Sequence, residues 1–335
     1  TGQRKIYASL WTNPRHPHHS THHTAPPAPP TPVTLGFWKA TNAQTLAQTA
    51  IKAGYRRFDC AADYGNEQEV GLGIQQAIAD GLCKREDLHI TSKLWNTFHQ
   101  DVELGLRKTL QDLNLEYLDR YLIHFPISTE FVPIEKKYPP EWTNLDGKMV
   151  LIENDLTDTW KQMERCVSLG LVREIGVCNF NTGLFRQICN IATIKPSVVQ
   201  VERHPLLTQT KLMRCYKEAG AEVMAFSPLG GRSYIPLDMA DDTEDLLTNP
   251  QIATIAAHHR KTPAQILLRW ALQSHTTPVC KSSSETRLRE NMDVLDFQLF
   301  AADMEALNAM NIHRRFNDPG AFAEAAFGCF CPIYD

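Results

Sequence analysis

Short runs of β-branched and aromatic residues alternate with longer stretches of helical periodicity from residue 32 onward. The predicted strands are residues 33–36, 55–60, 88–94, 117–125, 172–177, 197–202, 222–227 and 277–280. The predicted helices are residues 43–53, 67–80, 102–113, 156–169, 182–192, 209–219, 249–259, 286–292 and 302–310. Helical crossovers of this length join parallel strands, and eight strand-then-helix units favour a closed barrel over an open sheet. We therefore expect an α/β fold of the (β/α)8 TIM-barrel type.

Length and composition agree with one such barrel and exclude several other classes of protein. A chain of 335 residues, 43% of them hydrophobic, can bury a core of this size, and we assign residues 33–335 to a single domain. No G-x-G-x-x-G segment follows the first predicted strand, which disfavours a Rossmann domain. With 34 basic and 38 acidic residues the net charge is -4, so we expect neither nucleic acid nor a membrane surface as a partner.

Residues 1–32 have a different composition, and we expect them to form a flexible extension. The stretch 12–32 holds five of the 13 histidines and seven of the 20 prolines, with almost nothing apolar to bury. Metal binding is an alternative role for its histidines, which are His16, His18, His19, His22 and His23.

The nine cysteines lack the even number and the regular spacing of a disulfide framework or a zinc site. We expect them to be free thiols in a reducing cytoplasm, and we expect no bound metal. The cysteines are Cys60, Cys83, Cys166, Cys178, Cys189, Cys215, Cys280, Cys329 and Cys331. No apolar run in the sequence is long enough to cross a bilayer.

Three consecutive predicted strands end in polar side chains that can take part in proton transfer. Asp59 ends the second strand, with Tyr64 close behind it. Lys93 ends the third strand and His124 the fourth. In a parallel barrel the carboxyl ends of the strands meet at one rim, so we expect these four side chains to lie together. Each alone has an ordinary structural explanation, such as a buried ion pair or a core histidine, but their joint position favours an active site.

This set suits the protonation of an oxygen atom on which negative charge develops. A phenol with a pKa near ~10 is a weak acid at neutral pH, but an adjacent ammonium group favours the phenolate and lowers that pKa. We expect Lys93 to act on Tyr64 in this way, while Asp59 keeps the amine charged and in position. His124 can donate to a carbonyl oxygen and orient it. The sequence therefore favours carbonyl reduction over hydrolysis, because no serine or cysteine nucleophile is placed beside a histidine.

Two connections, at residues 126–155 and 228–248, are too long to be simple loops. Both leave the rim that carries the polar residues, where long loops usually cover a substrate or a cofactor. We expect the second connection to cover a cofactor, and we hypothesise that its opening and closing limit turnover.

Seven long motifs follow one another along the chain. They are GYRRFDCAADYGNE, ITSKLWN, YLIHFP, GVCNFN, VVQVERHP, SPLGG and VCKSSSETRLREN. In this order they resemble the motifs of the aldo-keto reductase superfamily, and the resemblance covers residues 33–319. Within the family, the segments FVPIEKKYPPEW and RRFNDP are similar to those of xylose reductases and of plant aldose or sugar-phosphate reductases.

The resemblance implies roles for single residues. Tyr64 matches the family's proton donor, Lys93 and Asp59 match the pair that lowers its pKa, and His124 matches the residue that orients the carbonyl group. The implied contacts of the nicotinamide and the pyrophosphate are Asn179, Gln200, Phe226, Ser227, Leu229 and Gly230. The implied contacts of the adenosine 2′-phosphate and the adenine are Lys281, Ser282, Arg287, Glu290 and Asn291. The implied walls of the substrate pocket are Trp38, Trp95, His124 and Phe125.

Three positions beside the implied cofactor depart from the family pattern. Phe226 stands where tyrosine is usual, so the stacking face is kept and a hydroxyl is lost. Cys178 stands where serine is usual, which weakens a hydrogen bond to the carboxamide, and Phe37 stands where threonine is common. Lys281 and Arg287 together favour NADPH, although some similar enzymes also accept NADH.

The resemblance implies NADPH-dependent reduction of an aldehyde, such as a xylose-like aldose, to the corresponding alcohol. A sugar-6-phosphate reductase is an alternative, with Lys136, Lys137 and Arg314 as candidate phosphate contacts. A cofactor-binding barrel without catalysis is another alternative, which the complete proton-transfer set disfavours. We expect a small-molecule substrate as the partner, and a monomer or a homodimer.

Overall fold

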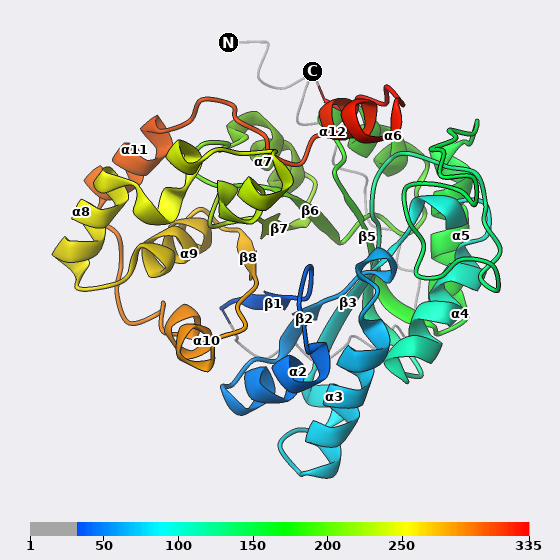
Figure 1. Ribbon diagram of the computed structural model, residues 1–335, viewed down its shortest axis with the longest axis horizontal. Coiled ribbons are helices and arrows are strands. Elements are labelled where there is room, and N and C mark those ends of the chain that lie inside the picture. Colours follow the sequence, from blue (N-terminus) through cyan, green and yellow to red (C-terminus); the bar gives the residue numbers. More distant parts are fainter. Residues whose placement is uncertain (1–31, 335) are drawn as a thin grey trace, which may run out of the picture.

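The computed structural model describes residues 32–334, which fold into a closed barrel of parallel strands (Figure 1). The strands are β1 (Thr34–Gly36), β2 (Arg57–Asp59), β3 (His89–Leu94), β4 (Leu118–Ile123), β5 (Val172–Cys178), β6 (Val198–Glu202), β7 (Glu222–Phe226) and β8 (Thr277–Cys280). Each strand pairs with its neighbour in sequence, and β8 returns to β1 with Cys280 beside Leu35. The predicted (β/α)8 TIM barrel is confirmed. The predicted extension at 1–32 lies outside the described residues, except for Pro32.

Helices surround the barrel on its outer side (Figure 1). The α-helices are α2 (Ala43–Lys52), α3 (Glu67–Ala79), α4 (Val102–Leu113), α5 (Leu156–Ser168), α6 (Thr182–Ile191), α7 (Thr210–Glu218), α8 (Pro250–His259), α9 (Pro263–Gln273), α10 (Glu285–Met292), α11 (Ala301–Ala309) and α12 (Pro319–Phe327). The short 3-10 helices are η1 (Ala62–Tyr64), η2 (Arg85–Asp87), η3 (Asn96–Phe98), η4 (Gly231–Ser233), η5 (Ile235–Leu237), η6 (Asp242–Glu244) and η7 (Leu246–Thr248). Of the α-helices, α9 and α12 are absent from the predicted ranges.

Both of these additional helices begin with a capping residue followed by proline. The Thr262 side chain accepts a hydrogen bond from the amide of Gln265 at the start of α9, and Asp318 caps α12 in a similar way. In α9 the side chain of Gln265 also accepts from the backbone N–H of Thr262, which completes a capping box. This cap is the sequence signal that identifies the helix.

The amino-terminal end of the barrel is closed by ion pairs. Arg120 donates to Glu174 at 2.7 Å and to Glu222 at 2.5 Å, and Arg57 also reaches Glu222 at 3.2 Å. Close backbone packing continues above this layer, since a Cβ atom on Gly176 of β5 would lie 2.2 Å from a carbonyl oxygen of β6. The ion pairs fill the amino-terminal end of the barrel, and packed backbone and side chains fill its interior. A ligand site can therefore form only at the carboxyl-terminal ends of the strands.

Candidate active site

The ammonium group of Lys93 lies at the centre of the predicted proton-transfer set. Its Nζ donates to Asp59 Oδ2 at 2.7 Å, to the Cys60 carbonyl at 2.8 Å and to the Tyr64 hydroxyl at 3.1 Å. All three donor positions of the amine are therefore used. Lys93 is 1% exposed and Asp59 is 2% exposed, so water screens their ion pair very little.

Strand pairing explains why these side chains meet. Asp59 at the end of β2 pairs with Thr91 of β3, two residues before Lys93. Side chains alternate along a strand, so Asp59 and Lys93 point to the same face of the sheet. The 3-10 helix η1 then turns the chain back, with Gly65 in the left-handed region at a φ of 70°, and returns Tyr64 to the amine.

Burial governs the protonation of both partners. Burial raises the pKa of Tyr64 and the charge of Lys93 lowers it by less, so this pKa lies above its ordinary value. The expected effect of Lys93 is present, but the expectation of a lowered pKa is wrong for the structure as it stands. Burial by itself would lower the pKa of Lys93, but the charge of Asp59 raises it above the ordinary value. The phenol is therefore protonated and the amine charged at neutral pH.

His124 faces Tyr64 across the rim, with 6.0 Å between the ring centroids. Its ring stacks on Phe125 at 4.8 Å and meets Trp95 edge-on at 5.3 Å. The Nδ1 atom lies 3.2 Å from Asp63 Oδ1, although neither atom has a hydrogen-bond partner among residues 32–334. The aromatic neighbours fix the orientation of the imidazole ring, and Asp63 adds a carboxylate beside it.

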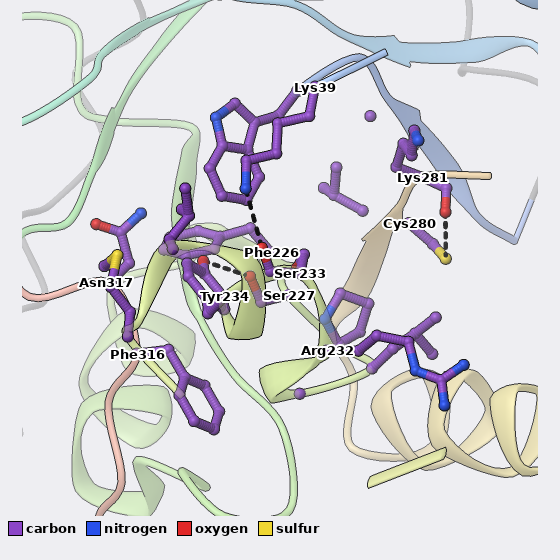
Figure 2. Close-up of a pocket in the computed structure, with 18 of the residues that line it drawn as sticks. Lys39, Phe226, Ser227, Arg232, Ser233, Tyr234, Cys280, Lys281, Phe316 and Asn317 are labelled. Carbon is purple, nitrogen blue, oxygen red and sulfur yellow. Dashed lines mark hydrogen bonds between the residues drawn. The ribbon is translucent and has the colours of Figure 1, made fainter. Parts of the chain in front are cut away.

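A cavity of about 1630 Å³ opens at this rim, which exceeds the usual size of a site for a single small ligand. The predicted residues in its wall are Trp38, Asp59, Tyr64, His124, Phe125, Asn179, Gln200, Phe226, Ser227, Leu229, Gly230, Lys281, Ser282, Arg287, Glu290 and Asn291. Figure 2 shows Lys281 and Asn317 on opposite sides of this cavity, with Phe226 and Ser227 between them. Lys93 lies beneath the wall.

Trp95 also lies behind the wall and not in it. It is 1% exposed and meets Trp142 edge-on, with 4.9 Å between the ring centroids. Trp142 itself lines the cavity. The apolar wall that was predicted for Trp95 is therefore provided by Trp142, which Trp95 supports from behind.

Two side-chain amides connect the cavity with the proton-transfer set. Gln200 Nε2 donates to Asp59 Oδ1 at 2.7 Å, and Asn179 Nδ2 donates to the His124 carbonyl at 2.9 Å. Asn179 and Ser227 have left-handed φ values of 61° and 51° directly after β5 and β7. Such conformations are uncommon outside glycine and concentrate at functional sites.

The long connection at 228–248 is held at the rim by contacts from distant parts of the chain. Lys39 Nζ donates to the Ser233 carbonyl at 3.0 Å, as Figure 2 shows. On the other side Arg314 donates to both carboxylate oxygens of Glu244, one of them at 3.0 Å. The connection consists largely of short 3-10 helices and supplies part of the cavity wall. It therefore has the position that we predicted for a cofactor cover.

Several residues of the cavity wall are absent from the predicted set, and they include Asp63, Trp142, Tyr234, Phe316 and Asn317. The ring of Tyr234 stacks on that of Phe316 at 5.5 Å, and its hydroxyl lies 2.7 Å from Ser227 Oγ. The fully buried Glu202 accepts hydrogen bonds from the backbone N–H groups of Phe316 and Asn317, each at 2.8 Å. Only the motif RRFNDP gave a sequence signal for this segment.

A model of the Aldo/keto reductase family matches residues 33–312. The chain belongs to the aldo/keto reductase family. The NAD(P)H-dependent D-xylose reductase I,II of Candida tropicalis is 48% identical over 294 residues, which are 86% of this chain and 91% of that protein. The NADH-dependent D-xylose reductase of Candida parapsilosis is 45% identical over 298 residues, covering 87% and 92%. A crystal structure of a Bombyx mori aldo-keto reductase in complex with NADP has a TM-score of 0.77 and 33% identity, covering 88% of this chain and 93% of that one.

The cations proposed for a sugar-phosphate group are not gathered at the cavity of this aldo/keto reductase. Lys137 Nζ lies 2.9 Å from a Glu141 carboxylate oxygen and donates to the Thr143 carbonyl at 2.7 Å. Arg314 is the single member of the three that lines the described cavity, and it is already paired with a carboxylate. The structure therefore gives the sugar-phosphate alternative no specific support.

Residues 32–334 were also expected to contain free thiols and no metal site. Among residues 32–334, no three histidine, cysteine or carboxylate side chains are grouped so that they could hold a metal ion. All nine cysteines lie in this part and are free thiols. None of its helices has the length and apolar character needed to cross a membrane.

Proposed function

We propose that this chain is an NADPH-dependent aldose reductase that converts a xylose-like aldehyde to the corresponding alcohol. The observation that carries the proposal is the 3.1 Å contact between Lys93 Nζ and the Tyr64 hydroxyl, together with the position of Tyr64 and His124 in the wall of one cavity. The two xylose reductases named above support the substrate class. The complete proton-transfer set counts against a barrel that has lost catalysis.

The proposed roles follow from the contacts. Tyr64 donates its proton to the carbonyl oxygen of the substrate, and Lys93 stabilises the phenolate that this leaves behind. Asp59 keeps Lys93 charged although the amine is buried. His124 donates a hydrogen bond that holds the substrate oxygen near Tyr64. Phe125 and the other apolar side chains of the wall exclude water from the reacting atoms.

Two cations in the cavity wall support an NADP cofactor independently of the family resemblance. Burial lowers the pKa of Lys39, and the nearby Lys281 lowers it further, so two cations share one part of the wall. Such a pair favours an anion, and the 2′-phosphate of the cofactor is one. At the other end, Phe226 offers an aromatic face for the nicotinamide ring, while Asn179 and Gln200 offer amides for its carboxamide. When bound, the reduced nicotinamide supplies the hydride.

The proposal is tested by measuring kcat/KM for D-xylose and for glucose 6-phosphate, each with NADPH and with NADH. We expect the highest value for xylose with NADPH. Tyr64→Phe should lower kcat by about 10²- to 10⁴-fold while NADP⁺ still binds, because only the proton donor is removed. Full activity of this variant would refute the mechanism. A wild-type protein that binds NADPH but reduces no aldehyde would restore the non-catalytic alternative.

We further propose a cytoplasmic location and an assembly no larger than a homodimer. The free thiols are typical of a reducing compartment. Fractionation of the source cells and sedimentation analysis of the purified protein test these two points. A secreted protein or a stable tetramer would contradict them.

A further inference from the structure

We propose that Tyr334, near the carboxyl end of the chain, is a positioning residue for the nicotinamide end of the cofactor site. The inference rests on the proposed function, because it requires Asn179 to contact the carboxamide of the cofactor. The Tyr334 hydroxyl donates a hydrogen bond to Asn179 Oδ1 at 3.1 Å. The two residues are 155 positions apart in the sequence, so this contact brings the end of the described chain to the catalytic rim.

The Asn179 amide is held at both of its polar atoms. Its Nδ2 donates to the His124 carbonyl at 2.9 Å, while Tyr334 occupies one acceptor position of Oδ1. An amide has two donor and two acceptor positions, so one of each remains for a ligand. Asn179 is 2% exposed and its backbone N–H donates to the Gln200 carbonyl at 3.0 Å. The amide therefore presents its remaining positions in one orientation.

The tail is anchored independently of the hydroxyl. The Arg315 guanidinium carbon lies 3.4 Å from the centroid of the Tyr334 ring. Asn181, which caps α6, donates through Nδ2 to the Ile333 carbonyl at 3.2 Å, and Figure 1 shows α12 next to α6. A phenylalanine at position 334 would keep the ring on Arg315 and lose only the hydrogen bond.

The Tyr334 hydroxyl is also in the protonation state that this hydrogen bond requires. Burial raises the pKa of Tyr334, so the group remains a hydrogen-bond donor at neutral pH.

The test compares the binding of two ligands to the wild-type protein and to Tyr334→Phe by calorimetry. One ligand is NADP⁺, and the other is 2′-phosphoadenosine 5′-diphosphoribose, which lacks the nicotinamide. Loss of one neutral hydrogen bond predicts that NADP⁺ binds roughly three- to tenfold more weakly to the variant. The fragment should bind both proteins within about twofold, because it does not reach Asn179.

Tyr117→Phe is the matched control. The Tyr117 ring also lies against guanidinium groups, at 4.1 Å from Arg85 and 4.0 Å from Arg173, but just before β4 at the opposite end of the barrel. It should bind both ligands as the wild type does. A chain that ends at Ile333 should also lose affinity for NADP⁺ more than for the fragment, although it loses the ring contact with Arg315 as well.

Unchanged binding of NADP⁺ to Tyr334→Phe would overturn the inference. Equal weakening of NADP⁺ and of the fragment would also overturn it, because the tail would then act on the fold of the whole site. Failure of the proposed function gives a different result, because the wild-type protein would then either bind neither ligand or bind both and reduce no aldehyde.

Discussion

Replacement of Lys93 by methionine tests the charge that lies beside Tyr64. At a separation of 3.1 Å and an effective dielectric constant of about 20, an ammonium group stabilises a phenolate by roughly 5 kcal/mol. If about half of the phenolate charge has developed in the transition state, loss of the ammonium raises the barrier by roughly 2–3 kcal/mol. That increase corresponds to a ~100-fold decrease in kcat.

The assay is reduction of D-xylose at saturating NADPH, together with calorimetric binding of NADP⁺. Lys93 lies beneath the cavity wall, so binding should change by less than about threefold while kcat falls. Lys161→Met is the matched control, because Lys161 pairs with Asp158 at 2.7 Å on the exposed face of α5. This control should keep the wild-type values of kcat and of the dissociation constant.

Measurements of the unfolding free energy show whether Lys93→Met lowers kcat by removing the charge or by damaging the fold. Lys93→Met leaves Asp59 buried without a charged partner, which costs about 3–5 kcal/mol of unfolding free energy. The double variant Asp59→Asn/Lys93→Met removes both charges and should recover most of that stability. Its kcat should stay as low as in the single variant. Recovery of kcat together with stability would refute the electrostatic argument.

Two further predictions concern a buried carboxyl group and a cation of the cavity wall. Burial raises the pKa of Glu67 to about 8, so the folded chain keeps this proton up to about pH 8, while the unfolded chain releases it near 4.5. The free energy of unfolding therefore falls as the pH rises through this window. Glu67→Gln should raise the melting temperature at pH ~8 and change it little at pH ~4.5. The same pH dependence of the melting temperature in the wild type and the variant would contradict this. Arg287→Ala should weaken NADP⁺ binding ~10-fold or more and leave NAD⁺ binding unchanged, because only NADP⁺ carries the 2′-phosphate. Equal losses for both cofactors would exclude Arg287 as a phosphate contact.

The barrel and its catalytic rim were predictable because both follow from local patterns. Strand periodicity located all eight strands, and the rule that parallel strands end at one rim correctly predicted that Asp59, Lys93 and His124 lie at the same rim. Boundaries were less accurate, since β2 covers only Arg57–Asp59 of the predicted 55–60. A strand is assigned where it pairs with its neighbours, and the sequence of one strand does not state where that pairing stops.

What could not be predicted depends on contacts between distant segments. The hydrogen bonds from Phe316 and Asn317 to Glu202 join residues 114 and 115 positions apart, and no local sequence pattern predicts them. The pKa of Tyr64 differs from the expected one for a related reason. The sequence shows that a cation follows nearby, but the amount of water that the folded rim excludes is known only from the three-dimensional packing.

Asp59 divides its two carboxylate oxygens between the two halves of the proposed chemistry. Oδ2 holds the amine of Lys93, and Oδ1 accepts from the amide of Gln200 across the bore of the barrel. Lys93, which sets the acidity of Tyr64, and Gln200, which is proposed to hold the nicotinamide, are thus both bound to the carboxylate of Asp59. A substitution that moves Gln200 to accommodate another cofactor will therefore also shift Asp59 and change the pKa of Tyr64. Cofactor preference and the acidity of the proton donor are coupled through this one carboxylate.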